Sequence, residues 1–441
     1  MKNKISTKEI NKLAIPALFA GIAEPLLSIA DTAFVGHLPE LAKESLAAVG
    51  LVGVFLSMLI WILGQTRSAI STIISQYLGA DKLDEVANLP AQAIFAVLLL
   101  SFAIIGITYP FTREIFQLYN ASETLLDLSV TYYKIRIFGL PFTLLTFAVF
   151  GTFRGLQNTY FPMIIAILGA SLNIVLDYLL IFGIDFIPAY GIQGAAYASV
   201  IAQFAMAVIA IYFLYKKTPI RLKLQLPVNH EMGNLTKMIA NLFVRTIALN
   251  VALYMGSSYA TKYGEDSIAA YTIAINIWFF FAFVLDGYSS AGNILSGKLL
   301  GAKKYISLKQ LGKTLTNYGI IAGFLLSILA VVFYHKIGLL FIKDEIVLQK
   351  FYSVFWIVLL MQPINGIAFI YDGVFKGLGF MAYLRNVLLI ATFIGFIPTL
   401  FITDYFNLEL HGIWIAFTVW MLFRGGILLY KFRKLAIFNK V

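Results

Sequence analysis

Two acidic side chains and one amide inside apolar segments are the residues of this chain best suited to chemistry. Asp31 lies in the apolar segment 13–36, and Asp177 lies in the segment 160–184. Asn173 precedes Asp177 by four residues, so a helix would place both side chains on one face. A charge inside a bilayer costs about 2.5–3.5 kcal/mol on insertion scales and needs a partner. One arginine lies near their depth, and it cannot neutralise two carboxylates. We therefore predict that Asp31, Asn173 and Asp177 hold a proton or a cation.

A second group of charges lies deeper in the apolar segments. One further arginine, Arg136, lies nearer to the level of Asp31 and Asp177. Opposite charges in lipid usually pair. We expect Asp286 to pair with Arg245, because their segments are neighbours along the chain, with contact to a substrate or an ion as the alternative. Asp372 precedes Lys376 by one helical turn, which favours an ion pair there. The candidates for a charge network or for substrate contact are Arg67, Arg136, Arg245, Asp286 and Asp372.

The composition indicates the class of fold. The chain is 60% hydrophobic and 12% charged with a mean hydropathy of +0.85, whereas soluble domains are nearer roughly 45–50% apolar. We therefore predict an all-α polytopic membrane protein, and the lack of cysteine excludes disulfides and thiolate metal sites. An apolar run of about 20 residues crosses a bilayer. Twelve runs predict twelve transmembrane helices, near 13–36, 47–74, 89–111, 128–152, 160–184, 190–214, 236–261, 268–296, 312–334, 348–374, 383–404 and 411–430.

The twelve segments divide into two similar halves. A shift of 222 residues superimposes the halves without a gap and aligns, for example, Gly151 with Gly373. We predict two pseudo-symmetric six-helix bundles, an N-lobe at 1–215 and a C-lobe at 237–441, joined by a cytoplasmic linker at 216–236. The polar groups differ between the halves: Asp31, Asn173 and Asp177 align with Leu253, Gly395 and Thr399, and Gly64 and Phe150 align with Asp286 and Asp372.

Basic residues predict the orientation in the membrane. With an even number of spans both termini lie on one side, and the loops on that side carry 22 Lys and Arg residues against six in the other loops. By the positive-inside rule both termini are cytoplasmic. The net charge of +11 then reflects this topology and contact with anionic membrane lipids, not binding of nucleic acid. We expect a monomer in the cell (inner) membrane.

Several short stretches of the N-lobe form an ordered set of motifs. They are Glu24–Leu38, Arg67 nine residues before Gln76 in Gln76–Ala80, Arg136 five residues before Pro141, Leu172–Asp177 and Gly191–Ala196. Together they resemble the DinF branch of the multidrug and toxic compound extrusion (MATE) family, and the resemblance extends over essentially the whole chain. Leu285–Gly287 and Tyr371–Gly373 also resemble plant members of that branch, some of which export citrate.

This resemblance implies a secondary antiporter. Such a protein exports small amphipathic organic compounds, which include drugs, toxins and organic anions, in exchange for H⁺ or Na⁺ by alternating access. Its coupling site would consist of Asp31, Asn173 and Asp177. The resemblance implies no cofactor, and no metal beyond a Na⁺ ion at those three residues.

The resemblance also implies how the first helix moves and how the ion is held. The helix would bend at Pro16, and Pro25 is a second point at which it could kink. Where family members have a further ligand, this chain has Ala195, so backbone carbonyls, water or Ser199 would complete the shell. The coupling ion therefore stays open between H⁺ and Na⁺. NorM-type relatives use acids of the C-lobe instead, and Asp372 lies at such a position.

Two other classes of protein fit parts of the sequence. A lipid-linked oligosaccharide flippase of the same superfamily would use Arg67, Arg136 and Arg245 to bind pyrophosphate. A membrane prenyltransferase would need at least two facing acidic clusters to hold Mg²⁺, and the chain has one, at 81–85. It also has no Gly-rich phosphate loop, His cluster or nucleophile triad. We therefore predict a transporter and not an enzyme.

Overall fold

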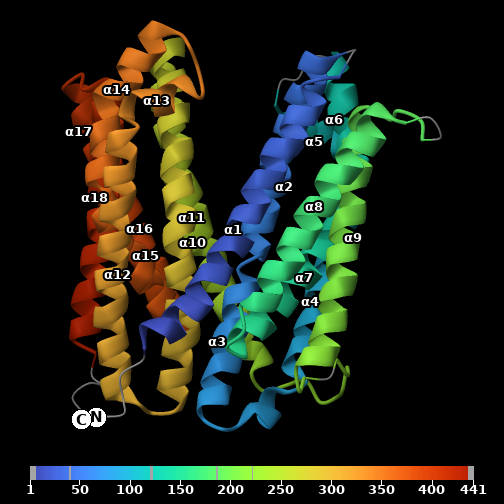
Figure 1. Ribbon diagram of the computed structural model, residues 1–441, viewed down its shortest axis with the longest axis vertical. Helices are drawn as coiled ribbons and strands as arrows, with labels where there is room; N and C mark the ends of the chain where they lie inside the picture. The colour runs from blue at the N-terminus through green and yellow to red at the C-terminus, as the bar shows by residue number, and fades with distance from the viewer. Residues whose placement is uncertain (1–5, 39–40, 120–122, 185–186, 221, 436–441) are drawn as a thin grey trace. The chain divides into compact units, whose positions relative to one another are not determined.

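The chain folds into helices, as a computed structural model shows (Figure 1). The structure describes residues 6–38, 41–119, 123–184, 187–220 and 222–435, and of residues 24–29 and 42 it describes the backbone alone. Within these ranges helices are joined by turns and irregular loops, and the one β feature is an isolated β-bridge between Ile184 and Ile187.

The prediction of twelve membrane-spanning segments is confirmed. Among the described residues, ten helical stretches are long and apolar enough to cross a membrane, and α14 with α15 forms an eleventh, bent one. The twelfth is α1, which is 29 residues long. The first six spans are α1 (Thr7–Val35), α2 (Ala42–Leu63) with α3 (Thr66–Gly79), α4 (Leu89–Thr108), α6 (Glu123–Arg136) with α7 (Leu140–Gly155), α8 (Tyr160–Phe182) and α9 (Ile192–Lys217). The last six are α10 (Met232–Lys262), α11 (Glu265–Gly301), α12 (Tyr305–Val332), α14 (Glu345–Leu360) with α15 (Gln362–Gly377), α16 (Met381–Ile390) with α17 (Ile397–Tyr405) and α18 (Glu409–Arg433).

Proline marks the interruption in three of the spans that consist of two helices. Pro141, Pro363 and Pro398 each stand at the first or second position of the following helix, where a missing N–H leaves no helical bond unmade. At Pro363 the helices α14 and α15 meet at 50°. The short elements are η1 (Leu83–Val86), α5 (Thr112–Gln117), η2 (Ile137–Gly139), α13 (Tyr334–Leu339) and a π-helical turn, η3 (Ala391–Phe396).

The chain forms two compact units. The C-terminal unit contains Met1–Leu18, Leu78–Asp81 and Lys237–Val441, and the N-terminal unit contains Phe19–Tyr77 and Lys82–Thr236. The chain therefore passes from one unit to the other within α1. The division into an N-lobe, a linker and a C-lobe at the predicted boundaries stays a prediction.

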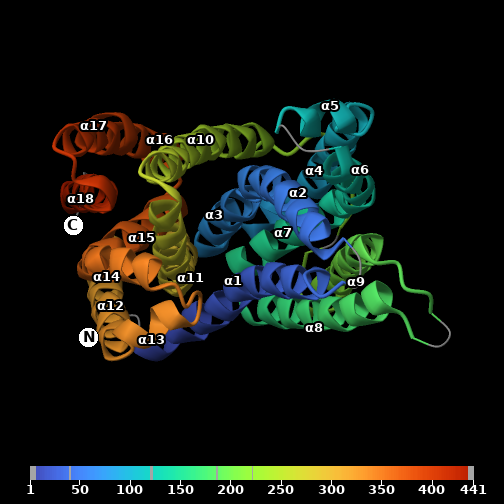
Figure 2. The same cartoon turned by 90° about the horizontal axis from the view of Figure 1, so that it is seen from above.

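Each unit has its own helix packing. In the C-terminal unit α11, α12 and α15 pack together (Figure 2). Helix α18 contributes the buried Trp414, Phe417 and Trp420 to an aromatic core. In the N-terminal unit α8 lies along α9, and α6 contacts both α2 and α9. Apolar burial does not drive helix association in lipid, so close packing must hold such helices together.

Glycines at equivalent positions of the two repeats allow close helix contacts. In the N-terminal unit, a Cβ atom on Gly151 would lie 2.6 Å from the carbonyl oxygen of Arg67. In the C-terminal unit, a Cβ atom on Gly373 would overlap the carbonyl oxygen of Ser289. Arg67 and Ser289 are separated by the same 222 residues as the two glycines. In the first repeat α3 therefore crosses α7 at the same point at which α11 crosses α15 in the second repeat.

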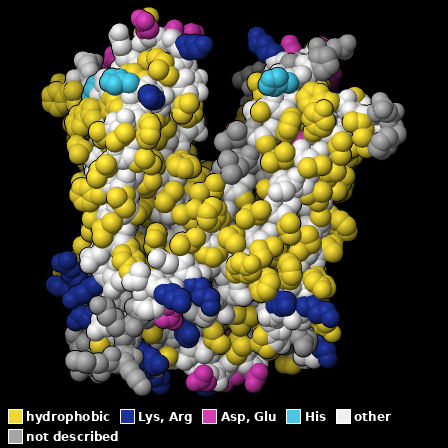
Figure 3. All heavy atoms as spheres, in the orientation of Figure 1, with side chains coloured by type: hydrophobic (Ala, Val, Ile, Leu, Met, Phe, Trp, Pro, Cys, Tyr) yellow, Lys and Arg dark blue, Asp and Glu magenta, His cyan; other side chains and the backbone are white. Residues whose placement is uncertain are grey.

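The surface has the pattern of a membrane protein. In both units hydrophobic side chains cover the middle of the face shown, and Lys and Arg side chains gather at its lower end (Figure 3). On α4, for example, Leu99, Phe102 and Ile107 are each at least 60% exposed. Side chains of this kind at this depth contact lipid acyl chains.

The glycine contact predicts a large effect of one methyl group. Gly373→Ala should lower the apparent melting temperature in detergent, because overpacking of a close contact costs about 1–3 kcal/mol. Gly426→Ala is the matched control, since a Cβ atom there would meet nothing within 4 Å. It should leave the melting temperature unchanged or slightly raised. Equal melting temperatures for the two variants would show that the helices adjust to the added methyl group.

Candidate ion-coupling site

Helices α1, α8 and α9 bring the predicted coupling residues into one buried cluster within the N-terminal unit. The exposed fractions of Asp31, Asn173 and Asp177 are 7%, 3% and 0%. Asn173 Nδ2 donates a hydrogen bond of 2.8 Å to Asp177 Oδ2, as expected from their spacing on one helix face. The carboxyl groups of Asp177 and Asp31 interact with each other across α8 and α1. Ser199 of α9 donates from Oγ to Asp31 Oδ2 at 3.3 Å.

The acid pair has unused binding capacity. The Oδ1 atoms of Asp31 and Asp177 are buried and have no hydrogen-bond partner among the described residues, although buried polar atoms are normally satisfied. Two like charges in a medium of low dielectric constant resist joint ionisation, so such a pair favours a shared proton or a bound cation. Carboxylate, amide and hydroxyl oxygens are ligands of hard cations. In the described ranges no three His, Cys, Asp or Glu side chains gather to hold a metal ion, so a cation here would also need oxygens of other residue types.

Arg136 is the basic residue that acts on the acid pair. It ends α6, where the turn η2 interrupts the span. Its charge acts on Asp177, and its Nη1 donates a hydrogen bond of 3.0 Å to Gln203 Oε1 on α9. Gly139 makes room for this bond, because a Cβ atom there would overlap the side-chain oxygen of Gln203. Arg136 therefore connects the acid pair to α9.

A pocket of about 80 Å³ lies in the N-terminal unit beside Gln203. The one charged side chain in its wall is Arg67, whose guanidinium carbon lies 5.0 Å from the centroid of the Phe147 ring. The pocket and the acid pair are thus connected through Arg136, since Gln203 lines the pocket and accepts a hydrogen bond from Arg136. The lining residues are Ala20, Ala23, Arg67, Thr143, Thr146, Phe147, Phe150, Ala166, Gln203 and Met206.

Sequence reasoning missed Gln203 and the two threonines of this pocket. Gln203 follows Ser199 by four residues, so the two side chains share one face of α9. This spacing is the signal that could have found it, because Ser199 was already a candidate ligand. Thr143 and Thr146 offer no such signal, since a hydroxyl in a membrane helix is commonly satisfied by its own backbone.

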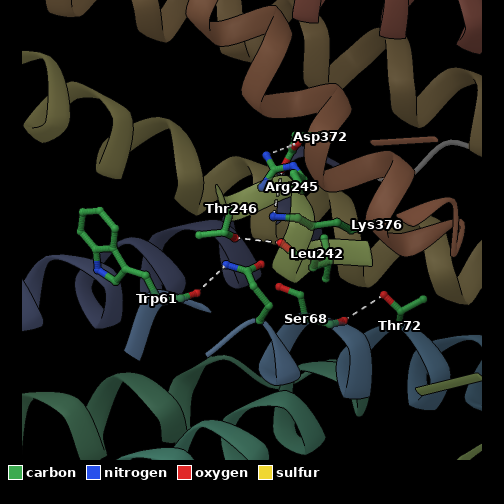
Figure 4. A network of polar contacts seen from close by, with 9 residues as sticks. Trp61, Ser68, Thr72, Leu242, Arg245, Thr246, Asp372 and Lys376 are labelled. Carbon is green, nitrogen blue, oxygen red and sulfur yellow. Dashed lines mark hydrogen bonds and ion pairs between the residues drawn. The ribbon is translucent and has the colours of Figure 1, made fainter. Parts of the chain in front are cut away.

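In the C-terminal unit Arg245 pairs with Asp372 (Figure 4). Arg245 Nη2 donates to Asp372 Oδ1 at 2.5 Å, and both side chains are 7% exposed. Lys376 Nζ lies 2.9 Å from Asp372 Oδ2, which is the i,i+4 pair that the spacing favours. The expected pair of Arg245 with Asp286 is wrong. Counting residues along a helix gives the depth of a side chain but not its face, and Arg245 faces α15 and not α11.

Asp286 lies apart from these charges. It is half-buried on α11, and it forms no ion pair with any residue that the structure describes. Beside it, a Cβ atom on Gly287 would lie 2.8 Å from Leu18 Cβ. Asp286 is therefore next to the point where the first part of α1 packs on α11, and its role as a substrate contact stays a prediction.

The proline residues of α1 lie inside a continuous helix. Pro16 and Pro25 both fall within Thr7–Val35, and the side chain of Pro25 lies outside the described residues. The boundary between the two compact units follows Leu18, two residues after Pro16. A proline removes one helical hydrogen bond and clashes with the carbonyl four residues earlier, so bending at Pro16 stays a prediction with a physical basis.

Twelve spans in two repeats, with a cluster of two buried acids in the first repeat and a buried ion pair in the second, are typical of a membrane transporter. The MatE family model matches residues 16–179 and 242–406, and the chain belongs to the MATE family. It is 28% identical to DNA damage-inducible protein F of Escherichia coli over 95% of this chain and 90% of that protein. It is 30% identical to the chloroplastic Protein DETOXIFICATION 44 of Arabidopsis thaliana over 94% of this chain and 80% of that protein. A crystal structure of a MATE protein in the bent conformation has the same fold, with a TM-score of 0.90 and 20% identity over 98% of this chain and 96% of that one.

The charge cluster of the C-terminal unit predicts a strong effect on stability. Asp372→Ala leaves Arg245 buried without its acid, and breaking a buried pair in this way costs about 3–5 kcal/mol. The apparent melting temperature in detergent should fall, and adding Arg245→Ala should recover part of the loss.

The matched control is Asp127→Ala. Asp127 pairs with Arg113 at 2.6 Å, but the two side chains are 60% and 49% exposed, so this variant should melt close to the wild type. A stable Asp372→Ala protein that has lost transport would instead assign Asp372 to the ion or the substrate.

Proposed function

We propose that this chain is a secondary antiporter that exports small amphipathic organic compounds in exchange for H⁺ or Na⁺. The observation that carries the proposal is the buried contact between Asp31 and Asp177, with Asn173 and Ser199 as further polar neighbours. Membership of the MATE family supports efflux of small molecules, since E. coli DNA damage-inducible protein F and the DETOXIFICATION proteins of A. thaliana are among the relatives. That match does not favour the lipid-linked oligosaccharide flippase.

The acid pair would act as the ion-coupling site. With both carboxylates ionised, the two charges repel, and Arg136 is one cation for two anions. A proton shared between the carboxyl groups, or a Na⁺ ion bound by their oxygens, removes this repulsion and lets α1 and α8 stay together. Loss of the ion would separate the acids. Ion binding would therefore favour one arrangement of α1 over another, which is the differential interaction that alternating access requires.

The pocket at Gln203 would receive the substrate. Arg136 interacts with Asp177 and with Gln203, so a change at the acid pair alters the polar partner of a residue in the pocket wall. Occupation of the pocket and of the ion site would then be coupled in both directions, as thermodynamic linkage requires. This connection runs within the N-terminal unit alone.

The orientation follows from the distribution of charge. The loops on the side of the termini carry most of the Lys and Arg residues, which places both termini in the cytoplasm by the positive-inside rule. With bacterial relatives such as E. coli DNA damage-inducible protein F, we propose an inner-membrane protein that works as a monomer. Asp31 and Asp177 would then lie in the outer half of the membrane.

Asp177→Asn tests the coupling site. Purified protein in liposomes, tested with one cationic and one anionic fluorescent dye, should move a dye when a proton gradient or a sodium gradient is imposed, and the ion whose gradient drives transport is the coupling ion. Asp177→Asn should abolish this gradient-driven transport, because an amide can neither take up the proton nor supply a charged ligand. Binding of substrate without a gradient should persist.

The control is Asp127→Asn, which removes a carboxylate of the same kind at an exposed position. It should transport at the wild-type rate. If Asp177→Asn also transports at that rate, the coupling site is not the acid pair, and Asp372 becomes the next residue to examine.

A further inference from the structure

We propose that the pocket at Arg67 binds the carboxylate group of an amphipathic organic acid. The proposal rests on the proposed transport function and specifies the head group that this site recognises. Its basis is a half-buried arginine whose buried Nε atom has no partner, a second buried group without a partner in the same wall, and a comparison with the other repeat.

Arg67 is a charge without an internal partner. Its Nε atom is buried and has no hydrogen-bond partner, and Arg67 forms no ion pair with any described residue. None of the described residues that line the pocket is acidic, and the side chain of Glu24, which follows Ala23 in α1, lies outside the described residues. Arginine stays protonated in proteins, so the wall of the pocket carries a full positive charge inside a membrane span, where such a charge is costly.

Thr143 supplies a second donor. Its Oγ1 atom is also buried without a partner. Two other polar atoms of the wall are already engaged: Thr146 Oγ1 donates to the Phe142 carbonyl at 2.8 Å, and Gln203 Oε1 accepts from Arg136. The unused groups therefore are two donors, and they fit a ligand that accepts hydrogen bonds.

The second repeat shows which charge is missing. The 222-residue shift aligns Phe147 with Phe369 and Phe150 with Asp372. In the C-terminal unit the guanidinium carbon of Arg424 lies 5.6 Å from the centroid of the Phe369 ring, and Asp372 acts on Arg424 while it pairs with Arg245. That unit thus has a carboxylate of its own that pairs with Arg245 and acts on Arg424.

The N-terminal unit also has an arginine over the aligned aromatic ring, although Arg67 and Arg424 are not aligned by the shift, and it has Phe150 at the position of the acid. Arg67 lies over Phe147, as Arg424 lies over Phe369, and Phe150 stands where the carboxylate of Asp372 stands in the other repeat. We infer that the carboxylate of a ligand supplies the missing charge. The guanidinium group can bind a carboxylate with two parallel hydrogen bonds, and Thr143 would donate a further one.

The size of the pocket limits the part of the ligand that it holds. A cavity of roughly 150 Å³ accommodates one benzene ring, and the volume here is about 80 Å³. The pocket therefore holds the carboxylate and the first carbons of the ligand, and the apolar body extends beyond it. A single arginine matches the single charge of a carboxylate better than the two charges of a phosphate monoester.

The test compares two ligands that differ in the head group alone. The probes are 1-naphthaleneacetate and its neutral amide, 1-naphthaleneacetamide, titrated calorimetrically into the full-length protein in an uncharged detergent. The wild type should bind the acid at least tenfold more tightly than the amide. Arg67→Gln should abolish this preference by weakening the acid alone, and Arg67→Lys should retain part of it. Equal affinities of the wild type for acid and amide, or an unchanged preference in Arg67→Gln, would overturn the proposal.

Two further variants control for folding and for nonspecific charge. Thr143→Val keeps the volume of the side chain and should weaken the acid about tenfold, the factor that corresponds to a lost hydrogen bond to a charged group. Arg113→Gln removes a cation at an exposed position outside the pocket and should bind both probes as the wild type does. If Thr143→Val binds the acid as tightly as the wild type does, the pocket does not hold the carboxylate.

The binding test is independent of the transport test, because it uses no ion gradient. Gradient-driven transport that survives in Asp177→Asn, together with loss of the acid preference in Arg67→Gln, would reject the coupling site and support the pocket. Loss of transport in Asp177→Asn with an unchanged preference in Arg67→Gln would reject the pocket and support the coupling site.

Discussion

The close approach of two backbones at a glycine is the constraint on which both units depend. In a bilayer, helices gain little from burying apolar surface against each other, so contact has to come from close packing. Gly151 and Gly373 provide this contact at equivalent points, against the carbonyls of Arg67 and Ser289. The same contact fixes the side chains next to it. In the N-terminal unit these are Arg67 and Phe150 at the pocket, and in the C-terminal unit the neighbour is Asp372 with its two cations.

On this shared frame the two repeats treat buried charge in opposite ways. The C-terminal unit pairs Asp372 with Arg245 and Lys376, so the charge of this acid is compensated by side chains. The N-terminal unit leaves one oxygen of Asp31 and one of Asp177 without a partner, as it does the Nε atom of Arg67. Uncompensated charge in a membrane is costly and is kept where a ligand completes it. This difference between the repeats supports our proposal that the exchangeable ligands bind in the N-terminal unit.

The sequence predicted the spans and the acid cluster because their signals are local. Apolar runs of sufficient length define the spans, and the spacing of Asn173 and Asp177 defines a helix face. The partner of Arg245 could not be predicted in the same way, because depth in the membrane follows from counting residues, whereas the direction of a side chain around the helix depends on packing. Gln203 shows a further limit. An uncharged polar residue costs less free energy in a membrane helix than a charged one. The presence of Gln203 in an apolar segment therefore did not indicate a functional role.

The C-terminal counterpart of the ion site explains why one repeat alone would bind the ion. Asn173 aligns with Gly395 inside the π-helical turn η3, and Asp177 aligns with Thr399. Thr399 donates to the carbonyl of Gly395 in its own helix, so its hydroxyl is used locally. Within the same turn, Thr392 donates to the Ala248 carbonyl and accepts from Trp420 Nε1. Side chains and backbone thus satisfy one another at this level, and the second repeat keeps the helix arrangement of the ion site without its carboxylates.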